Sequence, residues 1–206
     1  YEREAPGDLV HVDIKKLGRI PDGGGHRIHG RAQGGRNSSA HREQGRPRKV
    51  HGRPNLGYAF LHHAVDDHSR YTYSEILTDE KRETATAFMA RALQHFTSIG
   101  VATQRVMTDN GACYRSGDFA RIVGRRTRHQ KTKPYTPRHN GKVERYQRIL
   151  AEELLYAREF ESEEARDTAI GIWNIHYNYH RPHSGAGGHP PASRLRAGVT
   201  NVWPSY

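Results

Sequence analysis

Apolar positions in the first part of the chain are spaced as in β-strands. Residues 8–14, 58–65 and 71–77 carry apolar side chains in the short runs and alternations that are typical of strands. Residues 66–70, with the sequence DDHSR, have the turn chemistry that joins the last two runs into an antiparallel hairpin. Together with the first run, this hairpin predicts a three-stranded antiparallel unit.

Helical spacing replaces this alternation after residue 80. Residues 81–99 place apolar side chains at intervals of three and four, which predicts a helix with one buried face that ends at Gly100. The pattern then predicts a short strand at 104–108 parallel to the first, a short helix at 116–123, a polar strand at 127–132, and helices at about 140–157 and 162–179. These elements predict an α/β fold with a mixed sheet of three antiparallel and two parallel strands.

Residues 18–54 interrupt this pattern. They contain nine Gly and nine Arg or Lys but only two acidic residues, so they carry +7 of the chain's net charge of +11. Apolar side chains are nearly absent, and such a segment cannot bury enough surface to offset the entropy lost on ordering. We therefore expect a long flexible or partly ordered insertion, which either contacts a DNA backbone or serves as a solvated linker.

The overall composition predicts a basic, soluble, intracellular protein. The 206 residues have a pI of about 10.0 and a hydrophobic content of only 34%, and the first residue, Tyr1, predicts a fragment or a processed product. The single cysteine, Cys113, excludes an intrachain disulfide and a CxxC zinc site, and no apolar run approaches the length of a membrane span. A basic excess of this size favours nucleic acid as a partner, although ribosomal and scaffold proteins share it.

Acidic side chains stand at or near the ends of the predicted strands. They are Asp13, Asp66 or Asp67, and Asp109. Ligands of α/β sheets usually bind where strands end, and two carboxylates on adjacent strands with a third on a nearby helix would bind Mg²⁺ through hard oxygen ligands. Without a cation, clustered carboxylates repel one another and their pKa values rise. An edge-strand aspartate that faces water is the alternative interpretation of Asp13.

Glu144 is the candidate for the carboxylate on a helix. It lies in the first turn of the helix predicted at 140–157, beside Lys142, Arg145 and Arg148. A carboxylate in this position either complements the helix dipole and pairs with neighbouring bases, or binds a metal ion beside a phosphate-binding surface. This helix alone does not decide between the two roles.

Other side chains with potential chemistry have simpler explanations. His176 and His180 stand four residues apart, a spacing that can hold zinc, but no third ligand is evident nearby. We expect the aromatic side chains of the same region to pack in the core rather than to stack on bases. They are Trp173, Tyr177 and Tyr179.

The acidic positions lie in short motifs spread along the chain. These are HVD at 11–13, DDHSR at 66–70, TDNG at 108–111, PYTPRHNGKVER at 134–145, YNYHRPH at 177–183 and PPA at 190–192. The motifs resemble those of the catalytic core of the DDE transposase and retroviral-type integrase superfamily. The likeness covers nearly the whole chain and is greatest to bacterial insertion-sequence transposases of the IS481 group, whose basic insertion is similar to PDGGGHR at 21–27.

This resemblance implies a fold and a domain organisation. Residues 1–180 would form a ribonuclease H-like catalytic core with a basic insertion at about 18–54. Residues 181–206 would form a Pro/Gly-rich extension. The helix-turn-helix region that precedes the core in related transposases is absent from this chain, so we expect weak sequence-specific recognition of transposon ends.

The resemblance also implies a catalytic triad of Asp13, Asp109 and Glu144, which would bind two Mg²⁺ ions, with Mn²⁺ as a substitute. Glu144 follows Asp109 by 35 positions, close to the usual separation in the family. Residues 66–67 would have a structural role. The implied reaction is hydrolysis of a phosphodiester at a transposon end, followed by attack of the freed 3′-OH on target DNA.

Contacts with DNA and with partners follow from the same resemblance. Lys142, Arg145 and Arg148 would contact phosphates near the scissile bond, and Asn140 would cap or orient the helix that carries Glu144. The insertion would add three further cations to the DNA surface. These are Arg46, Arg48 and Lys49. The implied partners are transposon ends and target DNA, with a homo-oligomer assembled on them, and the implied location is the bacterial cytoplasm at the nucleoid, away from the membrane.

Two other functions would use the same fold. A ribonuclease H-like nuclease would cut DNA with the same triad without joining strands. An inactive remnant would bind DNA and lack activity, although the intact triad argues against it. A strand-transfer assay on a pre-cleaved end separates the transposase from the nuclease.

Overall fold

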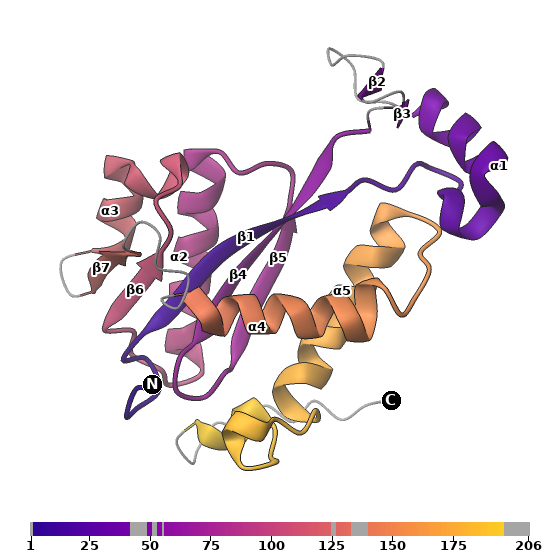
Figure 1. The fold of residues 1–206 in the computed structure, drawn as a ribbon. Coiled ribbons are helices and arrows are strands. Elements are labelled where there is room, and N and C mark those ends of the chain that lie inside the picture. Colours follow the sequence, from indigo (N-terminus) through magenta and orange to yellow (C-terminus); the bar gives the residue numbers. More distant parts are fainter. Residues whose placement is uncertain are drawn as a thin grey trace.

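A five-stranded sheet with the order β5-β4-β1-β6-β7 forms the centre of the computed structural model, which describes residues 2–41, 49–50, 53–54, 56–124, 127–132 and 140–195 (Figure 1). The strands are β1 (Val10–Gly18), β4 (Tyr58–Asp66), β5 (Thr72–Leu77), β6 (Arg105–Thr108) and β7 (Arg128–Lys131). β1 and β5 are antiparallel to β4, whereas β6 is parallel to β1 and β7 is parallel to β6. The predicted mixed sheet is therefore confirmed.

Alternation along the central strands gives the sheet two buried faces. Val10 and Val12 contribute to one apolar cluster, whereas Leu61 and Val65 contribute to another. Helices α2 (Arg82–Ser98) and α3 (Gly117–Val123) lie behind the sheet as drawn in Figure 1, and α4 (Gly141–Leu150) and α5 (Glu163–Tyr179) lie in front of it. Both sides of the sheet are thus removed from water by amphipathic helices.

The helices follow the predicted apolar spacing closely. The buried residues of α2 are the predicted stripe, Ala85, Phe88, Met89, Ala92 and Phe96. Ser116 caps α3 and Ser162 caps α5, each by accepting a hydrogen bond from the backbone N–H three residues later. These sequence-based helix boundaries are confirmed.

Helix α4 continues into the π-helical turn η3 (Ala151–Leu155), and the two together fill the helix predicted at 140–157. The Tyr146 ring of α4 contacts the Trp173 and Tyr177 rings of α5 at centroid distances of 5.7 and 5.0 Å. Tyr179 donates or accepts a hydrogen bond at the Tyr71 hydroxyl, 3.0 Å away. The prediction that these aromatic residues pack in the protein interior is confirmed.

The basic insertion is more ordered than its composition predicts. Helix α1 (His26–Ala40) occupies its first half, and the short strands β2 (Lys49–Val50) and β3 (Arg53–Pro54) pair near its end. Gly30 interrupts α1 with a φ of 75°, a conformation that glycine adopts without strain. The Arg27 guanidinium donates hydrogen bonds to the Leu155 and Tyr156 carbonyls, so α1 is fixed to the end of η3.

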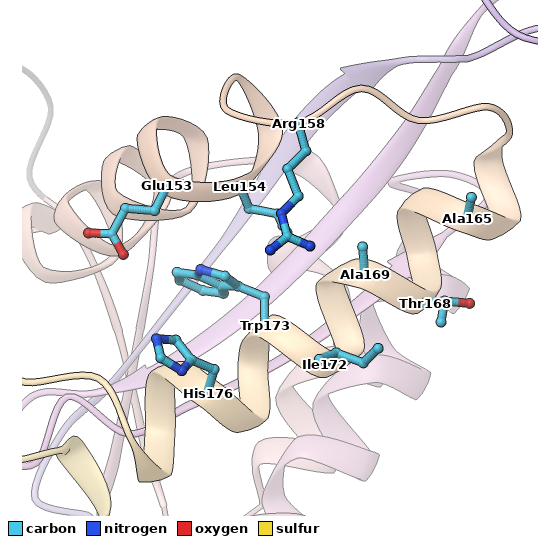
Figure 2. Close-up of a pocket in the computed structure, with 9 residues that line it drawn as sticks. All are labelled: Glu153, Leu154, Arg158, Ala165, Thr168, Ala169, Ile172, Trp173 and His176. Carbon is cyan, nitrogen blue, oxygen red and sulfur yellow. The ribbon is translucent and has the colours of Figure 1, made fainter.

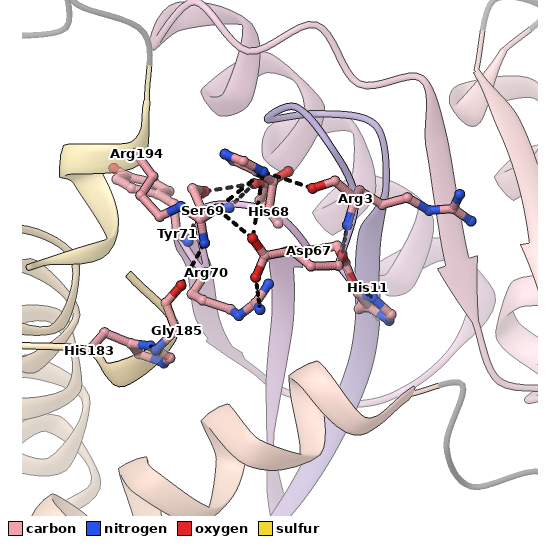
Figure 3. Close-up of polar contacts among 12 residues, drawn as sticks. Arg3, His11, Asp67, His68, Ser69, Arg70, Tyr71, His183, Gly185 and Arg194 are labelled. Carbon is pink, nitrogen blue, oxygen red and sulfur yellow. Dashed lines mark hydrogen bonds and ion pairs between the residues drawn. The ribbon is translucent and has the colours of Figure 1, made fainter. Parts of the chain in front are cut away.

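The Pro/Gly-rich segment after α5 docks on the N-terminal residues. Two 3₁₀ turns, η4 (Ser184–Ala186) and η5 (Pro191–Arg194), lie beside residues 2–8 and the β4–β5 turn (Figure 3). The Arg194 guanidinium donates to the Glu2 carboxylate and to the Gly185 carbonyl, and Leu195 is buried in the cluster beneath α2. The described part of this segment is therefore fixed to the N-terminal residues by side-chain hydrogen bonds and by burial of Leu195.

Candidate active site

Asp13 lies in the middle of β1, and not at a strand end as the sequence analysis supposed. It is the fourth residue of a nine-residue strand and stands opposite His63 of β4. Its carboxylate accepts a hydrogen bond from Gln147 Nε2 of α4 at 3.0 Å. The strand is longer than predicted because residues 15–18 continue to pair with β4. Asp13 therefore points to the face of the sheet that α4 covers.

Asp109 follows the end of β6, and the strand register brings it towards Asp13. Val106 pairs with Val10 and Met107 with His11, so continuing the parallel register by two residues places Asp109 opposite Asp13. Adjacent strands lie about 4.8 Å apart, and paired residues of parallel strands point to the same face. Asp109 is exposed, and its carboxylate accepts a hydrogen bond from the Gly111 N–H at 2.8 Å.

Glu144 approaches from above the sheet. It lies in the first turn of α4, one turn before Gln147, and its side chain is exposed. Burial raises the pKa of Asp13 to about 6, and the negative charges of Asp109 and Glu144 add to this rise. Hydrogen bonds from the Ile14 N–H and from Gln147 oppose it. The charges of Asp109 and Glu144 therefore act on Asp13, and the catalytic triad stays a prediction.

The donor set has the chemistry of a site for a hard divalent cation. Within the residues that the structure describes, no group of three or more His, Cys, Asp or Glu side chains lies close enough together to hold a metal ion. The three carboxylates are nevertheless close enough for like-charge repulsion to raise the pKa of Asp13. A divalent cation removes that repulsion, and carboxylate oxygens are the ligands that Mg²⁺ prefers.

Asp66 and Asp67, the alternative acidic pair, are fully buried, and their carboxylates accept hydrogen bonds. Asp66 accepts hydrogen bonds from the Gly7 N–H and from both the N–H and the hydroxyl of Ser69. Asp67 accepts one from the Arg3 N–H and contacts His11 Nε2 at 2.9 Å. These carboxylates hold the β4–β5 turn against the N-terminal residues, which is the structural role that the resemblance implies.

Three predicted DNA contacts on α4 differ in exposure. Arg145 and Arg148 are exposed, whereas Lys142 is partly buried. Burial lowers the pKa of Lys142, the charge of Arg70 adds to this, and Asp67 opposes it. Lys142 therefore lies beside the Asp67 side of the β4–β5 turn, so its surroundings are different from those of the two arginines.

Asn140 occupies the N-cap position of α4 but does not cap it in the predicted way. Its side chain makes no cap hydrogen bond, and its Oδ1 is buried without a partner in the described part of the chain. The backbone conformation at Asn140 (φ −108°, ψ 13°) departs from the extended conformation of a usual N-cap. Gln147, which the sequence analysis missed, instead links α4 to Asp13. Its place one turn after Glu144 was the available signal.

Several predicted residues lie outside the described regions. Arg46 and Arg48 are not among the described residues, and Lys49 is described only as part of the backbone of β2.

The rings of His176 and His180 stack at a centroid distance of 6.3 Å. No helix within the described residues is long and apolar enough to cross a membrane.

One cavity near α5 lies apart from the three acids. It has a volume of about 470 Å³ and is bounded by η3, α5 and the loop between them (Figure 2). Trp173 and His176 form one wall, and Glu153 and Arg158 lie at its rim. None of the three acids lines it. An exposed site such as that of Asp109 and Glu144 suits a large substrate that lies across the surface, rather than a small one that enters a cavity.

The mixed sheet, with acids on adjacent strands and on the helix that crosses them, is the architecture of a polynucleotidyl transferase core of the ribonuclease H-like class. The chain belongs to the integrase core domain family. One integrase core domain model matches residues 3–137 and a second matches residues 125–191. The family that the sequence motifs resemble is thereby confirmed, while the narrower likeness to the IS481 group stays a prediction.

Solved structures of retroviral integrases have the same fold. The catalytic core domain of BIV integrase superposes with a TM-score of 0.56 at 16% identity, covering 92% of this chain and 93% of that one. The HTLV-2 integrase catalytic core domain in complex with magnesium gives 0.56 at 17%, covering 93% and 97%. The simian T-cell lymphotropic virus intasome in complex with a PP2A regulatory subunit gives 0.67 at 17% identity. The match to the intasome covers all of this chain and 60% of that one.

Proposed function

We propose that this chain is the catalytic core of a DNA transposase, which hydrolyses a phosphodiester at a transposon end and then joins the freed end to target DNA. The observation that carries the proposal is the approach of Asp13, Asp109 and Glu144 to one another on the α4-covered face of the sheet. Membership of the integrase core domain family supports it. The further likeness to insertion-sequence transposases rests on the sequence motifs.

Asp13, Asp109 and Glu144 are the residues that would hold Mg²⁺ or Mn²⁺. When bound, a pair of such ions supplies charge neutralisation at the phosphodiester and activation of the attacking oxygen. Gln147 fixes the orientation of the Asp13 carboxylate through its 3.0 Å hydrogen bond. Arg145 and Arg148, both exposed on the helix that carries Glu144, bind phosphates on either side of the scissile bond.

The two proposed steps are both displacements at phosphorus. In the first step, a water oxygen forms a bond to phosphorus and the 3′-oxygen leaves as the 3′-OH of the transposon strand. In the second step, that 3′-OH forms a bond to a phosphorus of target DNA and the target's 3′-oxygen leaves. One phosphodiester is broken and one is made, so the second step needs no energy-carrying co-reactant. The protein contributes alignment of the attacking and leaving oxygens.

A strand-transfer assay tests the proposal. The reaction uses a pre-cleaved donor duplex with a free 3′-OH, a plasmid target and Mg²⁺ or Mn²⁺. We expect joined product from the wild-type chain and a loss of at least about a hundredfold in Glu144→Gln, which corresponds to about 2.7 kcal/mol of transition-state stabilisation. Glu152→Gln is the matched control, since Glu152 is an exposed glutamate near the end of the same helical segment.

The outcomes separate the candidate functions. Full joining activity in Glu144→Gln would contradict the triad. Cutting without joining would identify a nuclease that uses the same residues. Absence of both reactions in a folded wild-type chain that binds DNA would identify an inactive DNA-binding protein.

The proposal includes DNA as partner and assembly of several copies on it. A basic surface and the fold shared with a viral intasome support these two points. Light scattering of the chain with and without DNA tests the assembly. An increase in the number of protein copies per particle on DNA is the expected result.

A further inference from the structure

A second cavity, of about 400 Å³, lies where the insertion meets the core. Its walls come from the end of β1, the start of α1, the end of η3, the following loop and α5. Figure 1 shows α1 beside the far end of β1, on the side towards which α4 and η3 run. The cavity thus exists only because the basic insertion folds against η3, where Arg27 binds two carbonyls. Its size lies within the range of roughly 300–1,000 Å³ that is usual for small-molecule sites.

The described lining of this cavity is strongly cationic. It contains five Lys or Arg residues and no Asp or Glu. These are Lys15, Lys16, Arg19, Arg27 and Arg166. Lys16 pairs with Glu80 and Arg166 pairs with Glu163, whereas the other three have no carboxylate partner in the described part of the chain. Arg19 and Arg27 bind only backbone carbonyls there, so their positive charges stay uncompensated. The site is therefore suited to an anion.

Apolar and aromatic groups form the rest of the wall. Leu17, Ile20, Leu155 and Phe160 supply aliphatic and aromatic surface. Tyr156 also lines the cavity, and 70% of this residue is exposed. A concave site that combines cations with an exposed aromatic residue matches a ligand that has a charged group and a flat ring.

The cavity lies further along β1 and along the α4–η3 helix than the three acids do. Lys15 and Leu17 point to the same face of the sheet as Asp13, because side chains alternate along a strand. Leu17 lies about 13 Å along β1 from Asp13, at about 3.3 Å per residue. Leu155 lies about 16 Å along the helix from Glu144, at about 1.5 Å per residue. A DNA strand that advances about 3.4 Å per nucleotide reaches the cavity four to five nucleotides from the acids.

We propose that this cavity binds one unpaired nucleotide of the DNA substrate, four to five positions from the scissile phosphate. Tyr156 stacks on the base, and the charges of Lys15, Arg19 and Arg27 attract the flanking phosphates. This inference rests on the proposed function because it takes the substrate to be DNA. A closed duplex cannot place a base in a cavity, so the site requires a frayed, flipped or single-stranded nucleotide.

Fluorescence anisotropy in the presence of a chelator tests the inference without catalysis. The two probes are a labelled DNA duplex with a single-stranded overhang and the same duplex with blunt ends. We expect wild-type protein to prefer the overhang probe. Tyr156→Ala should weaken binding of the overhang probe about tenfold and leave blunt-duplex binding nearly unchanged, because stacking on one base is lost. Tyr156→Phe keeps the ring and should keep the preference.

Charge is tested separately from stacking. Arg19→Gln should reduce the slope of log affinity against log salt for the overhang probe by about 0.7, the value for one single-strand phosphate contact. Arg121→Gln is the matched control, because Arg121 is an exposed arginine on α3 that pairs with Asp118 outside the cavity. A loss of folding in any variant is detected by its thermal transition, and the comparison of the two probes on the wild type then still tests the inference.

Two results would overturn the inference. One is an equal preference for the overhang probe in Tyr156→Ala and wild type, and the other is equal binding of both probes by the wild type. The proposed function fails in a different way, through absence of cutting and joining while the overhang preference persists.

Discussion

Two groups of carboxylates lie on this sheet in opposite states. Asp66 and Asp67 are fully buried, and between them accept hydrogen bonds from three backbone N–H groups, one hydroxyl and one imidazole. Asp109 is exposed with one backbone N–H donor, and Asp13 accepts one side-chain hydrogen bond. Hydrogen bonds satisfy the first pair, whereas in the second group burial, with the charges of Asp109 and Glu144, raises the pKa of Asp13.

The difference teaches how to tell structural acids from functional ones in this fold. A carboxylate that accepts several hydrogen bonds contributes to stability, and its loss leaves buried donors without partners. The pKa of Asp13 is instead raised by burial, with added repulsion from the charges of Asp109 and Glu144, and an arrangement of this kind points to a function rather than to stability. Asp66, the last residue of β4, and Asp109, the residue after β6, can be compared directly by substitution.

The largest expected effect is the loss of stability in Asp66→Ala. This change leaves the Gly7 and Ser69 N–H groups buried without an acceptor, and each such group costs about 1–3 kcal/mol. We expect the free energy of unfolding to fall by about 3–5 kcal/mol, measured by urea denaturation. Asp109→Ala, the matched control, should change it by less than about 1 kcal/mol, since Asp109 is exposed.

Equal losses of stability in the two variants would contradict the comparison. So would retention of strand transfer in Asp109→Ala. The expected pattern is a stable inactive protein in one case and an unstable protein in the other.

A smaller effect is expected from the pH dependence of the docked C-terminal segment. Burial lowers the pKa of His183 to about 4, and the positive charges of Arg70 and Arg181 add to this. His183 Nδ1 accepts a hydrogen bond from the Gly185 N–H, which requires an unprotonated nitrogen. The unfolded chain takes up a proton below about pH 6.5 while the folded chain resists until about pH 4, so stability is lost as the pH falls through this window.

Substitution of His183 isolates this contribution from those of other buried histidines. The free energy of unfolding of the wild type falls between pH 7 and 4. His183 accounts for up to about 3 kcal/mol of this fall, at 1.36 kcal/mol for each pKa unit. In His183→Gln the unfolding free energy should depend on pH less steeply over the same range. Denaturation curves at several pH values measure both proteins, and parallel pH profiles would contradict the assignment.

The sequence predicted most of the fold because its local signals agree with its packing. Alternation around Val10 and Leu61 identified the central strands, and the stripe from Ala85 to Phe96 identified α2. The register of β1 and β6 could not be read from the sequence, although it is what brings Asp109 opposite Asp13. The predicted strand ended too early, just after Asp13, because the alternation weakens at residues 15 and 16, where β1 still pairs with β4.

Helix α1 was missed for a different physical reason. Gly-rich and Arg-rich composition disfavours a helix by local propensity, and α1 buries only Gly34. Its order comes from tertiary contacts, with Arg27 bound to η3 and the Asn37 amide bound to the Gly23 and Gly24 carbonyls. The Arg27 contacts join residues more than 120 positions apart, so no local window of sequence contains them.

The smallest expected effect concerns the cations of α4. It tests whether the DNA lies over Arg148, near the three acids, or over Lys142, near the buried Asp67. Arg148 is exposed and Lys142 is partly buried near Asp67 and Arg70. If Arg148 contacts a phosphate, Arg148→Gln should reduce the slope of log affinity against log salt by about 0.9 for duplex DNA. Lys142→Gln should leave the slope nearly unchanged, because the ammonium group belongs to the buried turn rather than to the DNA surface. Anisotropy titrations over a range of salt concentrations measure both slopes, and a larger change in Lys142→Gln would place the DNA over the β4–β5 turn and join the two regions into one.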